Sequence, residues 1–270
     1  MLKQRILTAV VLAPLALGAL FFLPLDQFML LFDLVLLAAA WEWSALSGLK
    51  GKLRRVIYVF THALALLALH LVAVYWLSPQ LFVVPLLMWG AAFWWVRRYP
   101  GGGVWQIVNV RLLLGYLVLL PCWLAFLAIK AHPWSDQLLL MLLLLVWGAD
   151  VGAYFAGKRF GRTRLAAVSP GKTREGMYGG LLTCLLVALG ASVYWELSMS
   201  VAVYLVALAL ITGLISVLGD LFESMLKRHC GLKDSGSLLP GHGGVMDRID
   251  SLTAAAPVFA MAVLAADWQV

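Results

Sequence analysis

Residues 138–146 read LLLMLLLLV, a continuous apolar run within the longer apolar stretch 137–156. A stretch of about 20 apolar residues is long enough to cross a bilayer as a helix, whereas a strand of a membrane barrel would alternate polar and apolar residues. The whole chain shares this character, since 63% of its 270 residues are hydrophobic and 12% are charged, with a mean hydropathy of +0.95. Soluble domains average roughly 45–50% apolar and about 25% charged residues. The composition therefore excludes a water-soluble fold.

Nine apolar segments of this kind follow one another along the chain. The sequence predicts an all-α polytopic membrane protein with about nine transmembrane helices in one membrane domain, 1–270. The first segment follows Lys3 and Arg5 as a signal peptide would, but its apolar stretch exceeds the 7–15 residues typical of a signal sequence, so we interpret it as a retained helix. The predicted segments are 6–24, 28–47, 56–76, 79–96, 112–129, 137–156, 177–195, 200–223 and 252–269.

Basic residues set the predicted orientation, because loops on the cytoplasmic side carry the excess of lysine and arginine. With the N-terminus cytoplasmic and the C-terminus outside, Lys130 is the single one of the 20 basic residues that falls outside. The net charge of +7 therefore belongs to one membrane face beside anionic headgroups. It does not indicate a nucleic-acid partner.

Polar residues gather in two of the predicted cytoplasmic loops. Residues 157–176 read GKRFGRTRLAAVSPGKTREG, and residues 224–251 read SMLKRHCGLKDSGSLLPGHGGVMDRIDS. We therefore expect the chemistry in a catalytic core of about 137–257 that includes both loops, and a less specific role for the helices of 1–130.

The end of the eighth segment carries the first candidate site residues. Asp220, Glu223, Ser224 and Lys227 are spaced i, i+3, i+4 and i+7, which places them on one face if the helix continues past 223. Acidic groups in a membrane segment are expensive and usually functional. The alternative is that Glu223 and Lys227 form only a structural i, i+4 pair. Arg228 flanks this face.

The segment before the last helix adds a second group. Glycines just ahead of a helix N-terminus let backbone N–H groups approach a phosphate. Asp247 and Asp250, spaced i, i+3, can face the same way, and Asp247 and Asp220 could share a divalent ion with bound phosphate, as Mg²⁺ prefers. The alternative is that the two acids only cap the helix. The candidates are Lys233, Asp234, His242, Gly243, Gly244, Asp247, Arg248 and Asp250.

The third group lies around the loop 157–176. Asp150 precedes it inside the sixth segment, and the run Ser169-Pro170-Gly171-Lys172-Thr173 resembles the end of a phosphate-binding P-loop. Ala166 stands where the first glycine of that motif belongs, so the run is not a P-loop. Ser169, Lys172 and Thr173 remain candidate phosphate contacts. The other basic residues of the loop are explained by attraction to anionic lipid.

Polar residues elsewhere are less informative. Glu42, between two tryptophans, is compatible equally with a place in the site and with one at the membrane interface. Asp33 has no evident partner in the sequence. His62 and His70 are interpreted as packing residues.

Taken together, these motifs resemble the signature of the phosphatidate cytidylyltransferases, also called CDP-diacylglycerol synthases. The resemblance is dense over about 147–257 and looser before it; Arg174 departs from it, because many members have an aromatic residue there. The matching residues are Trp41-Glu42-Trp43, Trp147-Gly148-Ala149-Asp150, Gly152-Ala153-Tyr154, Phe160-Gly161, Ser169 to Thr173, Ser216 to Asp220, Ser224, Lys227-Arg228, Lys233-Asp234, Gly236, Leu239-Pro240, His242-Gly243-Gly244 and Asp247 to Asp250.

The resemblance implies a multi-helix enzyme of the bacterial inner membrane with its site on the cytoplasmic face. It implies CTP and phosphatidate as substrates, CDP-diacylglycerol and pyrophosphate as products, and a homodimer. It also implies Mg²⁺ at Asp220 and Asp247, with a second cation beside it.

The residues and the resemblance together give a hypothesis for the site. Asp150, Glu223 and Asp250 would support the metal, and His242 with the Gly243 and Gly244 amides would line the triphosphate. The basic groups that would clamp the phosphates are Lys172, Lys227, Arg228, Lys233 and Arg248.

Two other functions stay open from the residues alone. A CTP-dependent polyprenol or dolichol kinase also joins a membrane lipid to CTP, but it would release CDP. A secondary transporter is less compatible, because transporters tend to show repeated halves and midplane sites, whereas the polar residues here gather on one face.

Overall fold

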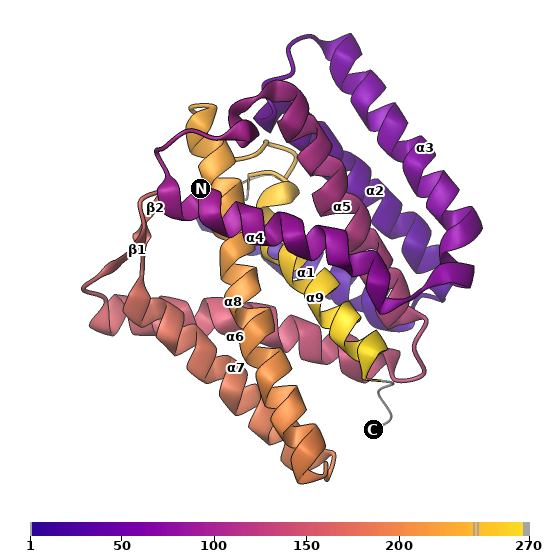
Figure 1. Cartoon of the computed structure of the whole chain (residues 1–270), viewed down its shortest axis with the longest axis vertical. Helices are drawn as coiled ribbons and strands as arrows, with labels where there is room; N and C mark the ends of the chain where they lie inside the picture. Colours follow the sequence, from indigo (N-terminus) through magenta and orange to yellow (C-terminus); the bar gives the residue numbers. More distant parts are fainter. Residues whose placement is uncertain (1, 240, 242, 267–270) are drawn as a thin grey trace.

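The computed structural model describes residues 2–239, 241 and 243–266, and over these residues the chain is a bundle of nine α-helices (Figure 1). Two short 3-10 helices, Pro79–Phe82 and Val104–Gln106, precede α4 and α5. The α-helices are α1 Leu2–Phe22, α2 Leu25–Leu46, α3 Lys52–Trp76, α4 Val83–Arg98, α5 Val108–Lys130, α6 Ser135–Phe160, α7 Arg174–Tyr194, α8 Met199–His229 and α9 Met246–Ala265.

Eight helical segments within the described residues, from α2 to α9, are long and apolar enough to cross a membrane. This confirms the predicted all-α polytopic class. The first predicted segment is also helical, as α1, but a ninth span and the orientation of the two termini stay predictions.

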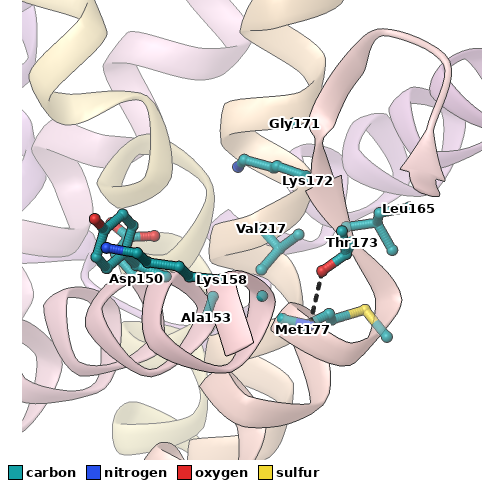
Figure 2. Close-up of a pocket in the computed structure, with 12 residues that line it drawn as sticks. Asp150, Ala153, Lys158, Leu165, Gly171, Lys172, Thr173, Met177 and Val217 are labelled. Carbon is teal, nitrogen blue, oxygen red and sulfur yellow. Dashed lines mark hydrogen bonds between the residues drawn. The ribbon is translucent and has the colours of Figure 1, made fainter. Parts of the chain in front are cut away.

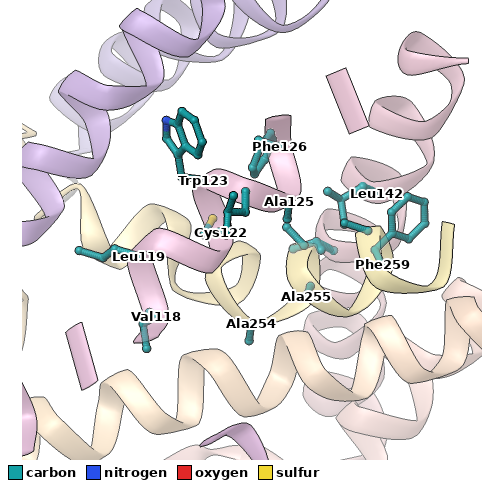
Figure 3. Packing of buried hydrophobic residues seen from close by; sticks show 14 of the residues in the cluster. Val118, Leu119, Cys122, Trp123, Ala125, Phe126, Leu142, Ala254, Ala255 and Phe259 are labelled. Carbon is teal, nitrogen blue, oxygen red and sulfur yellow. The ribbon is translucent and has the colours of Figure 1, made fainter. Parts of the chain in front are cut away.

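The centre of the bundle is the contact between α5 and α9, the two most deeply buried of the eight segments. Figure 3 shows Cys122 and Ala125 of α5 beside Ala254 and Ala255 of α9, with Leu142 of α6 nearby. All of these side chains are fully buried. Small side chains at a helix interface let the backbones approach closely, which is how membrane helices gain packing energy. The helix whose start carries the predicted acids, α9, is thereby packed into the most deeply buried part of the bundle.

The predicted loop 157–176 is more ordered than a connector. It continues α6 to Phe160, forms an antiparallel hairpin of β1 Arg164–Ala166 and β2 Ser169–Thr173, and enters α7 at Arg174. Thr173 caps α7, because its Oγ1 accepts a hydrogen bond from the N–H of Gly176 at 3.1 Å. The hairpin joins α6 and α7, which lie side by side (Figure 1).

The predicted loop 224–251 is shorter in the structure, so its boundaries were wrong. α8 continues to His229 and α9 begins at Met246, which leaves 230–245 as the connection. Hydropathy ends a predicted span near the first cluster of charges. Here the charges of Glu223 and Lys227 pair with each other, so the helix continues through them.

Asp33 has partners that the sequence does not reveal. Its Oδ2 lies 2.8 Å from Nε2 of His70 in α3, and its Oδ1 accepts a hydrogen bond from Nε1 of Trp123 in α5 at 2.7 Å. His70 is therefore more than the packing residue that the sequence predicted. The three side chains join α2, α3 and α5, whereas His62 is buried against Tyr58 and Tyr116 as expected.

We predict that Asp33→Asn lowers the stability of the folded protein by about 1 kcal/mol, the range measured for polar contacts between membrane helices. The asparagine keeps one acceptor oxygen but loses the charge that attracts His70. Thermal unfolding in detergent, followed by tryptophan fluorescence, measures the change. Activity per folded molecule should be unchanged; a loss of specific activity at full stability would contradict a purely structural role.

Candidate active site

The predicted face of α8 exists, and it is inside the protein. Glu223, Ser224 and Lys227 are buried, and Asp220 lies one turn earlier on the same face. Ser224 Oγ donates to Asp220 Oδ1 at 3.3 Å, and Lys227 Nζ donates to Glu223 Oε2 at 2.7 Å. The i, i+3, i+4, i+7 spacing read from the sequence is thus the spacing of a polar stripe on a continuous helix.

Lys227 connects this stripe to α9. Its ammonium group also donates to Asp247 Oδ1 at 2.6 Å, so it joins Glu223 of α8 to the first turn of α9. The predicted pair Glu223–Lys227 is present, but it is part of a three-residue contact between helices. Asp250, one turn after Asp247, is buried and lies close enough to Glu223 and Asp220 to interact electrostatically.

Asp247 is held by backbone and side-chain donors of the preceding loop. Its Oδ2 accepts hydrogen bonds from the Ser235 N–H at 2.9 Å, the Ser235 hydroxyl at 2.9 Å and the Gly244 N–H at 2.8 Å. The sequence predicted that the Gly244 N–H would contact a phosphate. In the structure this N–H donates to the Asp247 carboxylate and orients it. Gly243 closes the turn, since its carbonyl accepts from the N–H of Leu239 at 2.9 Å.

The β-hairpin supplies the second lysine of the site. Lys172 of β2 forms an ion pair with Asp220 Oδ2, which joins two predicted groups that are 48 residues apart. Asp150 of α6 interacts electrostatically with both of them. The predicted residues Asp150, Lys172, Asp220, Glu223, Lys227, Asp247 and Asp250 therefore form one cluster, although they come from four elements.

A pocket of about 400 Å³ opens beside this cluster, between α6, the hairpin, α7 and α8. Figure 2 shows Asp150 and Lys172 reaching into this region from different elements. The wall mixes polar side chains with apolar ones, as a site for a charged group carried on an apolar molecule requires. It consists of Asp150, Ala153, Tyr154, Gly157, Lys158, Leu165, Gly171, Lys172, Thr173, Gly176, Met177 and Val217.

Close approach of α8 and α9 is what brings their acids together, and Gly219 permits it. A Cβ on Gly219 would lie 2.5 Å from the carbonyl oxygen of Asp250 and 2.9 Å from the Cβ of Ala254. Any larger residue would push the two helices apart. The glycine directly precedes Asp220, so the closest backbone contact lies next to the cluster.

Four other predicted site residues are exposed, one is half-buried, and one is outside the described part of the chain. Arg228 is exposed and donates to the carbonyl of Leu232 at 3.3 Å, which stabilises the end of α8. Lys233, Asp234 and Arg248 are exposed. Ser169 is half-buried at the start of β2. His242 lies outside the described residues.

Sequence reasoning left open one residue that the structure places beside the cluster. Glu42 of α2 is buried, and its carboxylate contacts the loop that holds Asp247. The available signal was a carboxylate in an apolar segment, which favours function. Its partners could not be identified, because they are about 200 positions later in the chain.

The donor set can be compared with the needs of Mg²⁺. Five carboxylates face two lysines here, and Glu223 Oε1 is a buried oxygen without a hydrogen-bond partner. Among the described residues, no three acidic, histidine or cysteine side chains form a ready chelating group. Mg²⁺ usually keeps several waters and uses one or two carboxylates together with substrate phosphates. The residues therefore fit an ion that arrives with a nucleotide.

The structure is thus a bundle of helices long and apolar enough to cross a membrane, with paired acids and lysines at one end. The chain belongs to the cytidylyltransferase family, whose sequence model matches residues 3–266. This confirms the resemblance and the predicted enzyme class, a nucleotidyltransferase.

Similar proteins cover nearly the whole chain. It is 44% identical to the phosphatidate cytidylyltransferase of Pseudomonas aeruginosa, over 99% of both chains. It is 39% identical to the phosphatidate cytidylyltransferase of Haemophilus influenzae, over 96% of this chain and 97% of that one. The phosphatidate cytidylyltransferase of Synechocystis is 47% identical over 137 residues, 47% of this chain.

We predict that Gly219→Ala destabilises the protein by about 1–3 kcal/mol, as overpacking typically does, and lowers turnover more than tenfold because it separates Asp220 from the acids of α9. Gly190→Ala is the matched control, since a Cβ there meets nothing within 4 Å. Thermal unfolding and specific activity of the two variants test this. Equal behaviour of both variants would show that the α8–α9 approach does not matter.

Proposed function

We propose that this chain transfers the cytidylyl group of CTP to phosphatidate, which gives CDP-diacylglycerol and pyrophosphate. The observation that carries the proposal is the paired contact of Lys172 with Asp220 and of Lys227 with Asp247 in a membrane-spanning bundle. The near full-length similarity to proteins named phosphatidate cytidylyltransferase supports it.

The reaction needs no covalent enzyme intermediate. An oxygen of the phosphatidate phosphate attacks the α-phosphorus of CTP, a new P–O bond forms, and the bond to the bridging α–β oxygen breaks. Pyrophosphate leaves with that electron pair. Because two anions must meet, the enzyme's contribution is positioning and electrostatic stabilisation.

Lys172 and Lys227 are the positively charged side chains best placed to stabilise the two phosphates. An ammonium group has three N–H donors, and the contacts with Asp220, Glu223 and Asp247 fix each lysine while leaving at least one donor for a phosphate oxygen. Arg228, Lys233 and Arg248, which are exposed, would contact phosphates at the entrance of the site. Ser169 and Thr173 stay candidate phosphate contacts, and His242 and the Gly243 amide stay candidates for lining the triphosphate. Asp234 and Ser224 stay candidate site residues.

Mg²⁺ would be held by Asp220 and Asp247, with Asp150, Glu223 and Asp250 in support. When bound, the ion neutralises phosphate charge and orients the triphosphate for in-line displacement. The carboxylates themselves orient the two lysines. The second cation and the homodimer remain proposals that rest on the resemblance.

The location of the site follows from the proposed orientation. With the N-terminus in the cytoplasm of a bacterial cell, the hairpin and the 230–245 connection lie on the cytoplasmic side of the inner membrane. CTP reaches the cluster from water. The pocket wall combines Tyr154, Leu165 and Met177 with Asp150 and Lys172, so it suits a headgroup whose acyl chains stay in the bilayer.

A product assay tests the function directly. Purified protein in mixed micelles receives phosphatidate, Mg²⁺ and CTP labelled in the cytosine. We expect the label in the lipid fraction with one pyrophosphate per labelled lipid. Release of CDP with a phosphorylated lipid alcohol would instead establish a kinase, and flux in liposomes without chemistry would establish a transporter.

We predict that Asp220→Asn and Asp247→Asn each lower turnover more than a thousandfold, because losing a metal-holding carboxylate removes several kcal/mol of transition-state stabilisation. Asp136→Asn is the control: this acid is exposed at the other end of α6, and its variant should keep full activity. Size-exclusion profiles and melting curves verify folding. Wild-type turnover in either well-folded site variant would refute the assignment.

A further inference from the structure

Glu42 is a carboxylate that the proposed reaction does not use, yet it is among the most deeply buried charged groups of the chain. It lies near the end of α2, and its exposed fraction is 2%. The helices of residues 1–130 contribute none of the acids or lysines of the cluster. Burying a carboxylate is costly unless donors surround it, so its partners indicate what it is for.

The hydrogen-bond partners of Glu42 all belong to the loop and helix that carry Asp247, and Arg55 of α3 adds an electrostatic contact. Glu42 Oε2 accepts from the N–H of Met246 at 2.8 Å and from the Ser235 hydroxyl at 3.1 Å, and Oε1 accepts from the N–H of Val245 at 3.1 Å. The first N–H groups of a helix lack partners within it. α9 has no side-chain cap at Val245. Glu42 therefore caps α9 from another helix, where the helix dipole favours a negative charge.

Ser235 links the two carboxylates. Its hydroxyl lies 3.1 Å from Glu42 Oε2 and 2.9 Å from Asp247 Oδ2, while its own N–H donates to Asp247. A hydroxyl has one hydrogen and can donate it to one acceptor at a time. Ser235 is therefore held by both Glu42 and Asp247. A displacement of Glu42 would move Ser235, and Ser235 would in turn move the Asp247 carboxylate.

The loop is also shaped around this carboxylate. Gly236 and Gly244 pack directly against it, and a Cβ at either position would overlap the carboxylate oxygens of Glu42. Gly244 is the residue whose N–H donates to Asp247 Oδ2. Both loop residues that donate hydrogen bonds to Asp247, Ser235 and Gly244, are therefore in contact with Glu42.

We propose that Glu42 is a positioning residue for cytidylyl transfer. It caps α9 and holds Ser235 and Gly244 of the preceding loop, and through these two residues it sets the orientation of the Asp247 carboxylate toward Lys227. The effect on catalysis rests on the role proposed for Asp247, whereas the effect on the loop does not.

The test compares Glu42→Gln with Asp33→Asn, two isosteric losses of a carboxylate from the same helix. Glutamine has one acceptor oxygen, and its NH₂ group would face the N–H and O–H donors of the loop. We expect Glu42→Gln to lower kcat about a hundredfold, the cost of a misplacement of about 1 Å, in protein that remains folded. Asp33→Asn should change stability and leave kcat unchanged.

Hydrogen exchange provides a readout that does not depend on activity. In Glu42→Gln, peptides covering 235–246 should exchange at least tenfold faster, while peptides of α6 and α7 are unchanged. Ser235→Ala should also lower kcat, and the double variant should be no slower than the slower single one, because both act along one path.

Three results would overturn the proposal: wild-type kcat in folded Glu42→Gln, unchanged exchange over 235–246, or additive effects of the two substitutions. Failure of the cytidylyl-transfer proposal is distinguishable. It would appear in the wild-type product assay, while the exchange result would still decide whether Glu42 fixes the loop.

Discussion

The contact of Lys227 with Glu223 and Asp247 is the interaction on which the site depends. One ammonium group pairs with two carboxylates from two helices, in surroundings where an unpaired charge would be expensive. α8 can therefore remain helical through its charged end. α9 must begin close beside it, since Lys227 reaches both acids only if the helices are in contact. Gly219 permits that contact by leaving room for the backbone of α9. The pairing of charge and the packing of the backbone are thus two parts of one constraint.

The second ion pair adds an independent element to the same end of the bundle. Lys172 comes from a hairpin, and its partner Asp220 belongs to α8. A hairpin held between α6 and α7 places a lysine with more precision than a free loop would, because both strand ends continue into helices. The pocket lies where these elements meet. The polar part of the pocket wall includes Lys172, and the apolar part comes mainly from the helices. A lipid could therefore place its phosphate against the polar part and its acyl chains against the apolar part.

The sequence predicted what depends on local pattern. Apolar runs identified the membrane segments, and the spacing of Asp220, Glu223 and Lys227 identified a polar helix face, because both follow from helix geometry. Contacts between distant segments could not be predicted from one sequence. Lys172 with Asp220 and Asp33 with His70 are pairs of this kind, since many acids and bases were equally available as partners. The end of α8 was placed too early for a related reason: hydropathy treats a charge as solvated, whereas Lys227 pairs with Glu223 in the same helix and with Asp247 of α9.

The contacts of Glu42 assign a role to the helices of residues 1–130, which is to support the loop before α9. A membrane enzyme has to keep a polar loop ordered at the edge of the bilayer, and 230–245 has little secondary structure of its own. Among its described residues and the first residue of α9, three donors converge on Glu42 and three converge on Asp247. One of these carboxylates belongs to α9 and the cluster, and the other belongs to α2. α2 is itself tied to α3 and α5 through Asp33, so the loop is braced against a scaffold that carries none of the clustered acids and lysines. Residues 1–130 resemble the family less closely than the later part of the chain does. This is compatible with a supporting role, because that role requires only one well-placed carboxylate on a well-packed helix.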